Sequence, residues 1–134
     1  MQFEIHTDYA IRALRLLYVN NNEVMTAMQI AIGIGTTSPA FTKIANKLRS
    51  AGLLRTIQGG HGGYILGKPA NEISLYDVVK SIEGDLRINL CIENGERCEH
   101  GHDVKCKVHD IMYGVQEELI EKLSNIYVSD LVDE

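Results

Sequence analysis

Apolar side chains recur three and four positions apart in three stretches of residues 1–50, which is the spacing of one buried face of an α-helix. Residues 7–19 predict a first helix with Thr7 as its N-cap. Residues 26–35 predict a second helix with Thr26 as its N-cap, and residues 38–50 predict a third. Glycines between the second and third helices suit a tight turn, so this pair predicts a helix-turn-helix.

The third predicted helix has two unlike faces. One face is apolar and would pack on a core, whereas the other is polar and basic, as a helix that enters the major groove of DNA must be. A small helical hairpin with no role in DNA binding is the alternative that this stretch alone leaves open. The polar face consists of Thr42, Lys43, Asn46, Lys47 and Arg49.

A β-hairpin is predicted directly after the third helix. Residues 53–57 and 64–66 have the composition of strands, and the glycine-rich residues 58–63 join them. A hairpin in this place is the wing of a winged helix. Four glycines at its tip allow backbone N–H groups to approach phosphates, because no Cβ intervenes.

Two further helices complete the predicted elements. Ser74 and Asp77 have the spacing of a capping box at the start of a helix over residues 74–83. Residues 108–125 keep a 3.6-residue apolar spacing, so they predict a long helix whose broad stripe either folds back on the core or forms the seam of a dimer. The predicted fold class is mainly α with a small β-hairpin wing.

Length and composition narrow the class of protein. The 134 residues fit one domain, and neither a run of about 18 apolar residues nor a signal-peptide pattern is present, so we expect a cytoplasmic protein without membrane contact. Residues 1–70 carry seven Lys or Arg against three Asp or Glu, and residues 71–134 carry six against fifteen. A basic half beside an acidic one fits a DNA-binding head on a non-binding body, although two solvated faces of different charge fit as well. No nucleophile–base pair or phosphate loop is evident, so the sequence does not predict an enzyme.

All three cysteines of the chain lie close together, at Cys91, Cys98 and Cys106. In a reducing compartment, clustered thiols indicate metal or redox chemistry. His109 follows Cys106 by three positions, so on a helix the two share a face. Three thiolates and an imidazole suit an iron–sulfur cluster or a structural zinc ion. Because the spacings match neither a zinc finger nor a ferredoxin, a thiol switch also stays open.

Taken together, these features resemble the Rrf2 family of bacterial winged-helix transcriptional regulators. The resemblance covers nearly the whole chain, and the order and spacing of its markers are more specific than any one of them. The markers are residues 7–14 in the first helix, residues 47–53 at the end of the third helix, residues 59–66 in the wing, and the three cysteines before a long helix.

The resemblance implies an organisation in three parts. Residues 1–83 would form a winged helix-turn-helix domain, residues 84–107 a cysteine-rich cluster-binding loop, and residues 108–134 a dimerisation helix with a C-terminal tail. The protein would be a homodimer that binds double-stranded promoter DNA.

The same resemblance implies which residues contact DNA. The start of the third helix would enter the major groove, and Lys47 would touch a phosphate. Gln58 stands where family members often have Arg, which would weaken reading of the minor groove. The implied groove and wing residues are Ser38, Pro39, Ala40, Lys43, Gln58, Gly59, Gly60 and His61.

Finally, the resemblance implies a 2Fe–2S or 4Fe–4S cluster on the three cysteines. Asp8 of the partner subunit would be the fourth ligand, as in nitric-oxide sensors of the family, or His109 would be, as in its cluster-assembly regulators. The expected function is therefore an iron–sulfur-dependent, DNA-binding transcriptional regulator that senses iron–sulfur status, redox state or nitric oxide. A zinc-stabilised or thiol-switch regulator of the same fold is the alternative, and a small iron–sulfur electron carrier is a remote one.

Overall fold

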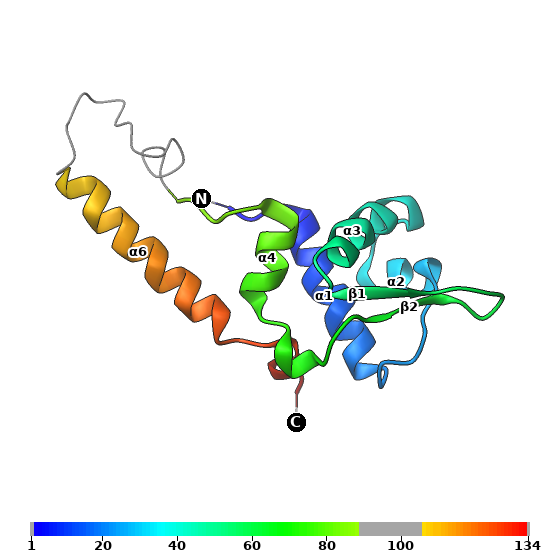
Figure 1. The fold of residues 1–134 in the computed structure, drawn as a ribbon. Helices are drawn as coiled ribbons and strands as arrows, with labels where there is room; N and C mark the ends of the chain where they lie inside the picture. The colour runs from blue at the N-terminus through cyan, green and yellow to red at the C-terminus, as the bar shows by residue number, and fades with distance from the viewer. Residues whose placement is uncertain (1, 89–105, 134) are drawn as a thin grey trace.

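A computed structural model of the chain describes residues 2–88 and 106–133. The described part is mainly helical with one two-stranded antiparallel sheet, which confirms the predicted fold class (Figure 1). The elements in chain order are α1 Ile5–Val19, α2 Ala27–Ile34, α3 Ser38–Ser50, β1 Leu54–Ile57, β2 Gly63–Leu66, the 3-10 helix η1 Ala70–Glu72, α4 Leu75–Glu83, α6 Lys107–Ser124 and the 3-10 helix η2 Val128–Asp130.

Two of the predicted helix starts are confirmed in atomic detail. The Thr26 hydroxyl accepts a hydrogen bond from the backbone N–H of Gln29 at 3.2 Å, and the Gln29 side chain accepts one from the Thr26 N–H at 2.9 Å. Ser74 and Asp77 form the same reciprocal pair at the start of α4, at 3.1 Å in each direction. Both pairs satisfy backbone donors that a helix start leaves without partners.

The predicted N-cap of the first helix is wrong. The N-cap is Glu4, three residues earlier, and helix α1 begins at Ile5. Thr7 therefore lies inside the first turn, where it is 1% exposed and its hydroxyl donates to Glu83 at 2.5 Å. The spacing of apolar residues showed the helix but could not show a partner that lies 76 positions away in the sequence.

The hydrophobic core lies between α1, α2, α3 and α4 (Figure 1). Leu14 and Leu17 of α1, Phe41 of α3 and Val78 of α4 are all fully buried in it. The wing is attached to this core, because the Tyr64 ring of β2 meets the Phe41 ring edge-on with their centroids 5.4 Å apart. The helix-turn-helix and the wing consequently form one packed unit.

Residues after α6 return to α1 and to the start of α4. The backbone N–H of Leu75 donates to the carbonyl of Ile126 at 2.8 Å, and that of Val128 donates to the carbonyl of Ile73 at 2.9 Å. Val128 is fully buried, and the Arg15 guanidinium donates to the carbonyl of Leu131 at 2.5 Å. The three-part division of the chain stays a prediction, but the end of its third part packs on its first.

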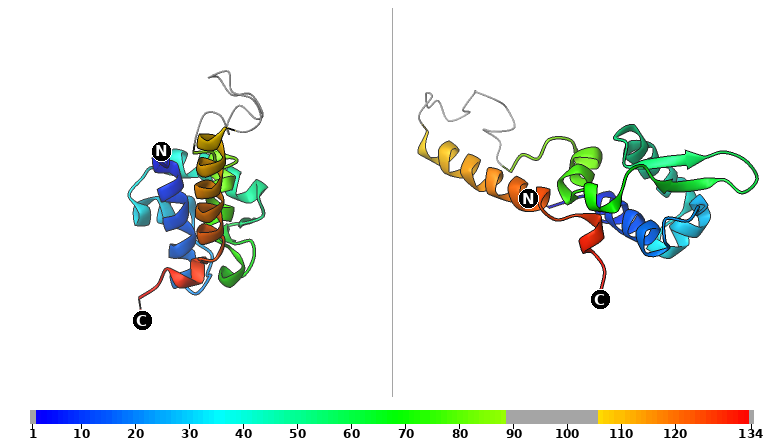
Figure 2. Two further views of the ribbon diagram at one scale, coloured as in Figure 1. Left: turned by 90° about the vertical axis from the view of Figure 1, so that its left-hand side faces the viewer. Right: turned by 60° about the horizontal axis from the view of Figure 1, so that its bottom comes forward.

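Helix α6 stands apart from the rest of the described chain. It contacts the core through α4, and its first turns extend well beyond the other helices (Figures 1 and 2). Its only buried residue is Gln116, whereas Val108, Ile111 and Val115 are 62%, 55% and 48% exposed. Among residues 2–88 and 106–133, every helix is too short or too polar to cross a membrane.

Candidate nucleic-acid interface and cysteine-bearing helix

The start of α3 is partly exposed to solvent. The Thr37 hydroxyl caps the helix by accepting from the backbone N–H of Ala40 at 3.3 Å. Pro39 and Lys43 are exposed, and Ser38 and Ala40 are half-buried. Because Phe41 faces the core, the four residues predicted to enter the major groove lie on the accessible side of one helix start.

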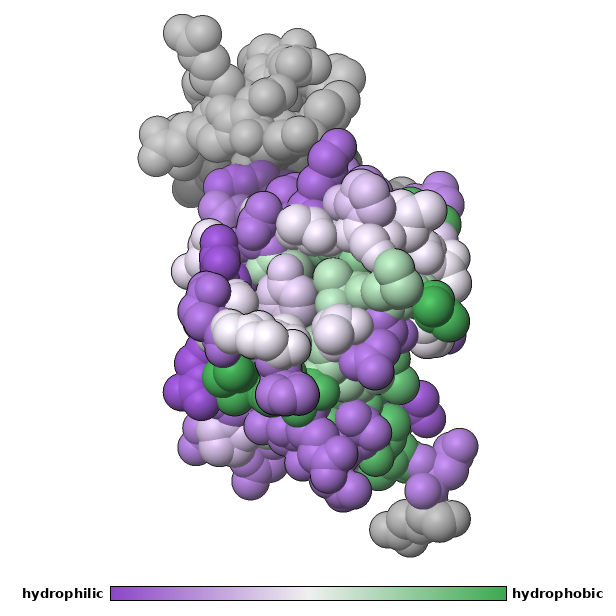
Figure 3. Space-filling model, turned by 90° about the vertical axis from the view of Figure 1, so that its right-hand side faces the viewer, coloured by the Kyte–Doolittle hydropathy of each residue, from purple (hydrophilic) through white to green (hydrophobic). Residues whose placement is uncertain are grey.

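The wing continues this accessible side. Strands β1 and β2 pair in register from Leu54 opposite Leu66 to Ile57 opposite Gly63, and the tip between them is exposed at Gln58, Gly59, Gly60 and His61. Figure 3 views the molecule from the wing side and shows hydrophilic residues around a centre of intermediate hydropathy. The predicted reading helix and wing are thus exposed next to each other.

Arg49 connects α3 with the wing, which sequence reasoning missed. Its guanidinium lies 3.4 Å from Thr56 Oγ1 on β1 and 3.4 Å from Asn46 Oδ1 on α3. The Asn46 contact follows the i, i+3 spacing of a helix and was readable from the sequence. The Thr56 contact was not, because it depends on where β1 lies.

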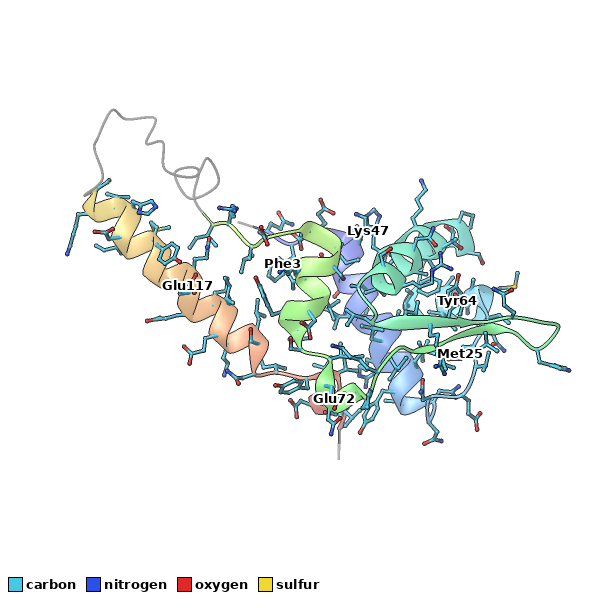
Figure 4. The ribbon with its side chains drawn as sticks, viewed as in Figure 1. Phe3, Met25, Lys47, Tyr64, Glu72 and Glu117 are labelled. Atoms are coloured by element: carbon cyan, nitrogen blue, oxygen red, sulfur yellow. The ribbon has the colours of Figure 1, made fainter. Side chains whose placement is uncertain are left out.

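Lys47 is exposed, but its ammonium has a hydrogen-bond partner within the chain. Its ammonium donates to the backbone carbonyl of Ile82, in the last turn of α4, at 3.3 Å. Figure 4 shows Lys47 on the side of the molecule where α1, α3 and α4 come together. The prediction that Lys47 touches a DNA phosphate stays untested, but its charge already has a partner within the chain.

Cys106 and His109 mark the start of α6. Cys106 is the half-buried N-cap residue, and His109 lies one helical turn further on. The His109 ring stacks on Tyr113 with centroids 6.1 Å apart, and its Nδ1 lies 3.7 Å from Asp110 Oδ1. Cys106 itself precedes the helix with an extended backbone, so a face shared by Cys106 and His109 stays a prediction. The other two predicted ligands, Cys91 and Cys98, lie outside the described residues.

Asp8 lies on a different part of the molecule. Its exposed carboxylate accepts a hydrogen bond from the Arg12 guanidinium at 2.7 Å, one turn along α1. The start of α1 and the start of α6 are well separated in Figure 1 and in the right-hand view of Figure 2, so one chain does not bring Asp8 to Cys106. Within residues 2–88 and 106–133, no group of three His, Cys, Asp or Glu side chains is close enough to hold a metal ion.

The residue types of the candidate ligands fit an iron–sulfur cluster or a zinc ion. Thiolates with one imidazole or one carboxylate are a common ligand set for iron–sulfur clusters and for zinc. Cys106 sits at a helix N-terminus, where orphan N–H groups favour a negatively charged ligand set. Gln116 ties the middle of α6 to the segment after α4, because its side-chain oxygen accepts from the backbone N–H of Ile88 at 3.1 Å.

Comparison with known proteins places the chain in a family. The family model Rrf2, described as an iron-dependent transcriptional regulator, matches residues 3–134. The putative HTH-type transcriptional regulator YffB of Lactococcus lactis is 30% identical over 124 residues, which are 90% of this chain and 80% of YffB. Protein aau3 of Rhizobium meliloti is 36% identical over 96 residues, 72% of this chain, and this match spans 62% of aau3.

Two solved structures show the same fold. CymR of B. subtilis, described as its global cysteine regulator, superposes with a TM-score of 0.79 at 20% identity over 98% of this chain and 95% of CymR. IscR of T. potens superposes with a TM-score of 0.76 at 21% identity over 98% of this chain and 85% of IscR. The family and YffB are described as transcriptional regulators, not as enzymes. The chain therefore belongs to the Rrf2 family of transcriptional regulators.

Proposed function

We propose that this regulator binds promoter DNA as a homodimer and that an iron–sulfur cluster on Cys91, Cys98 and Cys106 controls its affinity. The observation that carries the proposal is the position of Cys106. It begins the one described helix that stands away from the core, and that helix exposes an apolar stripe. A ligand change at Cys106 therefore acts on the element that a second copy would contact.

The stripe on α6 supports a dimer. Val108, Ile111 and Val115 recur at three and four positions and lie 48–62% exposed, a pattern that a second α6 would cover in an isologous contact. The separation of Asp8 from Cys106 within one chain fits the same arrangement, since Asp8 of the partner subunit could then complete the ligand set. His109 is the alternative fourth ligand, and it needs no second chain.

Replacing Ile111 by glutamate tests the dimer. The carboxylate would be buried without a partner in an α6–α6 contact, so we expect Ile111→Glu to be monomeric at concentrations where the wild type is dimeric. Sedimentation velocity measures this directly. Glu117→Gln, on an exposed position of the same helix, is the matched control and should leave the dimer intact. A wild-type monomer, or an unaffected Ile111→Glu dimer, would contradict the proposed seam.

Lys43 is proposed to contact DNA from the exposed side of α3. We expect Lys43→Ala to weaken specific promoter binding and to reduce the slope of log affinity against log salt by about 1, because one cation no longer displaces counterions. Fluorescence anisotropy titrations at several salt concentrations measure both quantities. Affinity and slope equal to those of the wild type would show that α3 does not read DNA through this face.

A bound cluster would give the regulator a group that oxidants, iron limitation or nitric oxide can alter. The chain's own residues would hold the group, and a change in its state would alter the relative position of the two α3 helices. In a dimer, the distance between the two α3 helices sets which half-site spacing fits, so a small rotation about α6 changes affinity.

A second function is favoured by one specific finding. The likeness to CymR of Staphylococcus aureus, whose structure is described as an oxidized form, fits a regulator whose thiols themselves change state. A zinc-stabilised form would use the same ligands without redox activity. In both cases α6 and the winged helix keep the same roles.

Metal and sulfide analysis of protein purified without oxygen distinguishes these functions. The cluster proposal predicts a brown protein that contains iron and sulfide in equal amounts and no zinc, and it predicts that Cys98→Ala loses the colour and changes DNA affinity. Stoichiometric zinc in a colourless protein would establish the zinc-stabilised form. A colourless, metal-free protein after reconstitution would exclude both metals, and affinity that then depends on thiol oxidation would establish the thiol switch.

A further inference from the structure

Three helices meet at the last turn of α4. On one side, the Thr7 hydroxyl of α1 donates to Glu83 Oε2 at 2.5 Å. On the other side, the Lys47 ammonium of α3 donates to the backbone carbonyl of Ile82 at 3.3 Å. Figure 4 shows Lys47 at this meeting point. We call these four residues the α4 junction.

Each hydrogen bond of the α4 junction stabilises the C-terminal end of α4. Carbonyls in the last turn of a helix lack intrahelical partners and carry partial negative charge, so an ammonium such as that of Lys47 is favourable there. The same partial charge disfavours the carboxylate of Glu83. The buried hydroxyl of Thr7 offsets this by hydrogen bonding one carboxylate oxygen.

The α4 junction lies between the reading helix and the candidate ligands. Thr7 directly precedes Asp8, and Lys47 lies one turn beyond Lys43 on α3. The chain that leaves α4 reaches Ile88, whose N–H is held by Gln116 of α6. A displacement of Asp8, or of α6 at Gln116, therefore has a short route to α3 through the α4 junction.

We propose that Lys47 is a positioning residue that holds α3 against α4, and that the α4 junction transmits the state of the cysteine ligands to the reading helix. Lys47 then acts within the chain and does not bind a DNA phosphate. The transmission rests on the proposed function, whereas the positioning role does not. The two parts need separate measurements.

The first measurement compares two lysines of the same helix by the salt dependence of promoter binding. Methionine keeps the aliphatic stem and removes the charge. A lost phosphate contact lowers the slope of log affinity against log salt by about 0.9. We expect this decrease in Lys43→Met and an unchanged slope in Lys47→Met. A decrease of about 0.9 in Lys47→Met would overturn the positioning role.

The second measurement is a double-mutant cycle in DNA affinity. Thr7 is 1% exposed and cannot touch DNA, so Thr7→Val removes only its bond to Glu83. We expect Thr7→Val and Lys47→Met each to weaken promoter binding by about 5- to 10-fold, at the lower end of the usual range of coupling between sites. If the α4 junction acts as a unit, the double variant binds promoter DNA with the same affinity as the single variant that binds more weakly.

Thr7→Ser is the matched control, because it keeps the hydroxyl and should bind DNA like the wild type. Thermal unfolding of each variant shows whether it is folded. Effects of Thr7→Val and Lys47→Met that multiply would show two independent sites. A Thr7→Val protein that is folded and binds DNA normally would likewise overturn the α4 junction as a unit.

The transmission is measured as the ratio of DNA affinities before and after the group on the cysteines is removed. We expect this ratio to be within about twofold of one in Lys47→Met but well away from one in the wild type. A variant that keeps the wild-type ratio would overturn transmission through Lys47. A wild-type ratio of one would instead overturn the proposed sensing function and with it the transmission, and the cycle would still decide the positioning role.

Discussion

Gly63→Ala is expected to destabilise the winged helix by about 2–3 kcal/mol and to abolish tight promoter binding. A Cβ at this position would lie 2.3 Å from the backbone carbonyl oxygen of Met25 and 2.7 Å from its carbon. Both neighbours are backbone atoms, so a change of side-chain rotamer cannot relieve the clash. The strain would fall on the bridge between Met25 and Tyr64, whose two hydrogen bonds are 3.2 and 2.8 Å long.

The consequence for DNA binding follows from what this bridge holds together. Met25 lies two residues before α2, and Tyr64 lies on the wing, so the bridge fixes the wing relative to the helix-turn-helix. Denaturant unfolding and promoter titration measure the two effects.

Gly60→Ala is the matched control for the stability effect. It places a methyl group on the same wing, where nothing lies within 4 Å of the new Cβ. We expect its free energy of unfolding to stay within about 0.5 kcal/mol of the wild type. A Gly63→Ala protein as stable as Gly60→Ala would contradict the packing of the wing against Met25.

Phe41→Ala is expected to cost about 3–5 kcal/mol of stability, a large part of the stability of an ordinary domain. Phe41 is fully buried, and its ring packs edge-on against Tyr64. The substitution leaves a cavity under the reading helix and removes the aromatic contact that joins α3 to the wing. Chemical denaturation gives the free energy of unfolding.

Thr42→Ala, on the exposed side of the same helix turn, is the control and should change stability by no more than about 0.5 kcal/mol. Equal stabilities of the two variants would mean that the core does not lie under α3. If Phe41→Ala lowered the stability of the helices while the wing stayed folded, the wing would not unfold cooperatively with the core.

Local patterns in the sequence were sufficient to predict most of the elements. The apolar stripes and caps predicted α2, α3 and α4 to within about two residues, because the signals for a helix start lie within four positions of each other. Helix α6 was predicted over residues 108–125 and runs over Lys107–Ser124. The hairpin was predicted with one residue too many in β1 and one too few in β2.

Contacts between distant residues were not predicted. The sequence gives no sign that Thr7 would bond to Glu83 instead of capping its own helix, or that Lys47 would bond to the end of α4. Nor does it show that Val128 returns to the core after a helix that stands apart. Each of these contacts depends on how helices pack, which the local spacing of side chains does not determine.

The candidate site was predictable in part. The exposed start of α3 follows from helical spacing alone, and so does the place of Cys106 and His109 at the start of α6. The choice between Asp8 and His109 is a different kind of question, because it depends on how a second chain lies against the first. Asp8 and Cys106 lie apart within one chain, so these two residues can come together only between two copies of the chain.

The most direct test of the account is the affinity of one protein preparation for its promoter DNA, measured without oxygen before and after the group on the cysteines is removed or oxidised. We predict a change of at least about fivefold, the lower end of typical coupling between two sites, and no change in Cys98→Ala. Equal affinities in the two states of the wild type would contradict control of DNA binding by the cysteines.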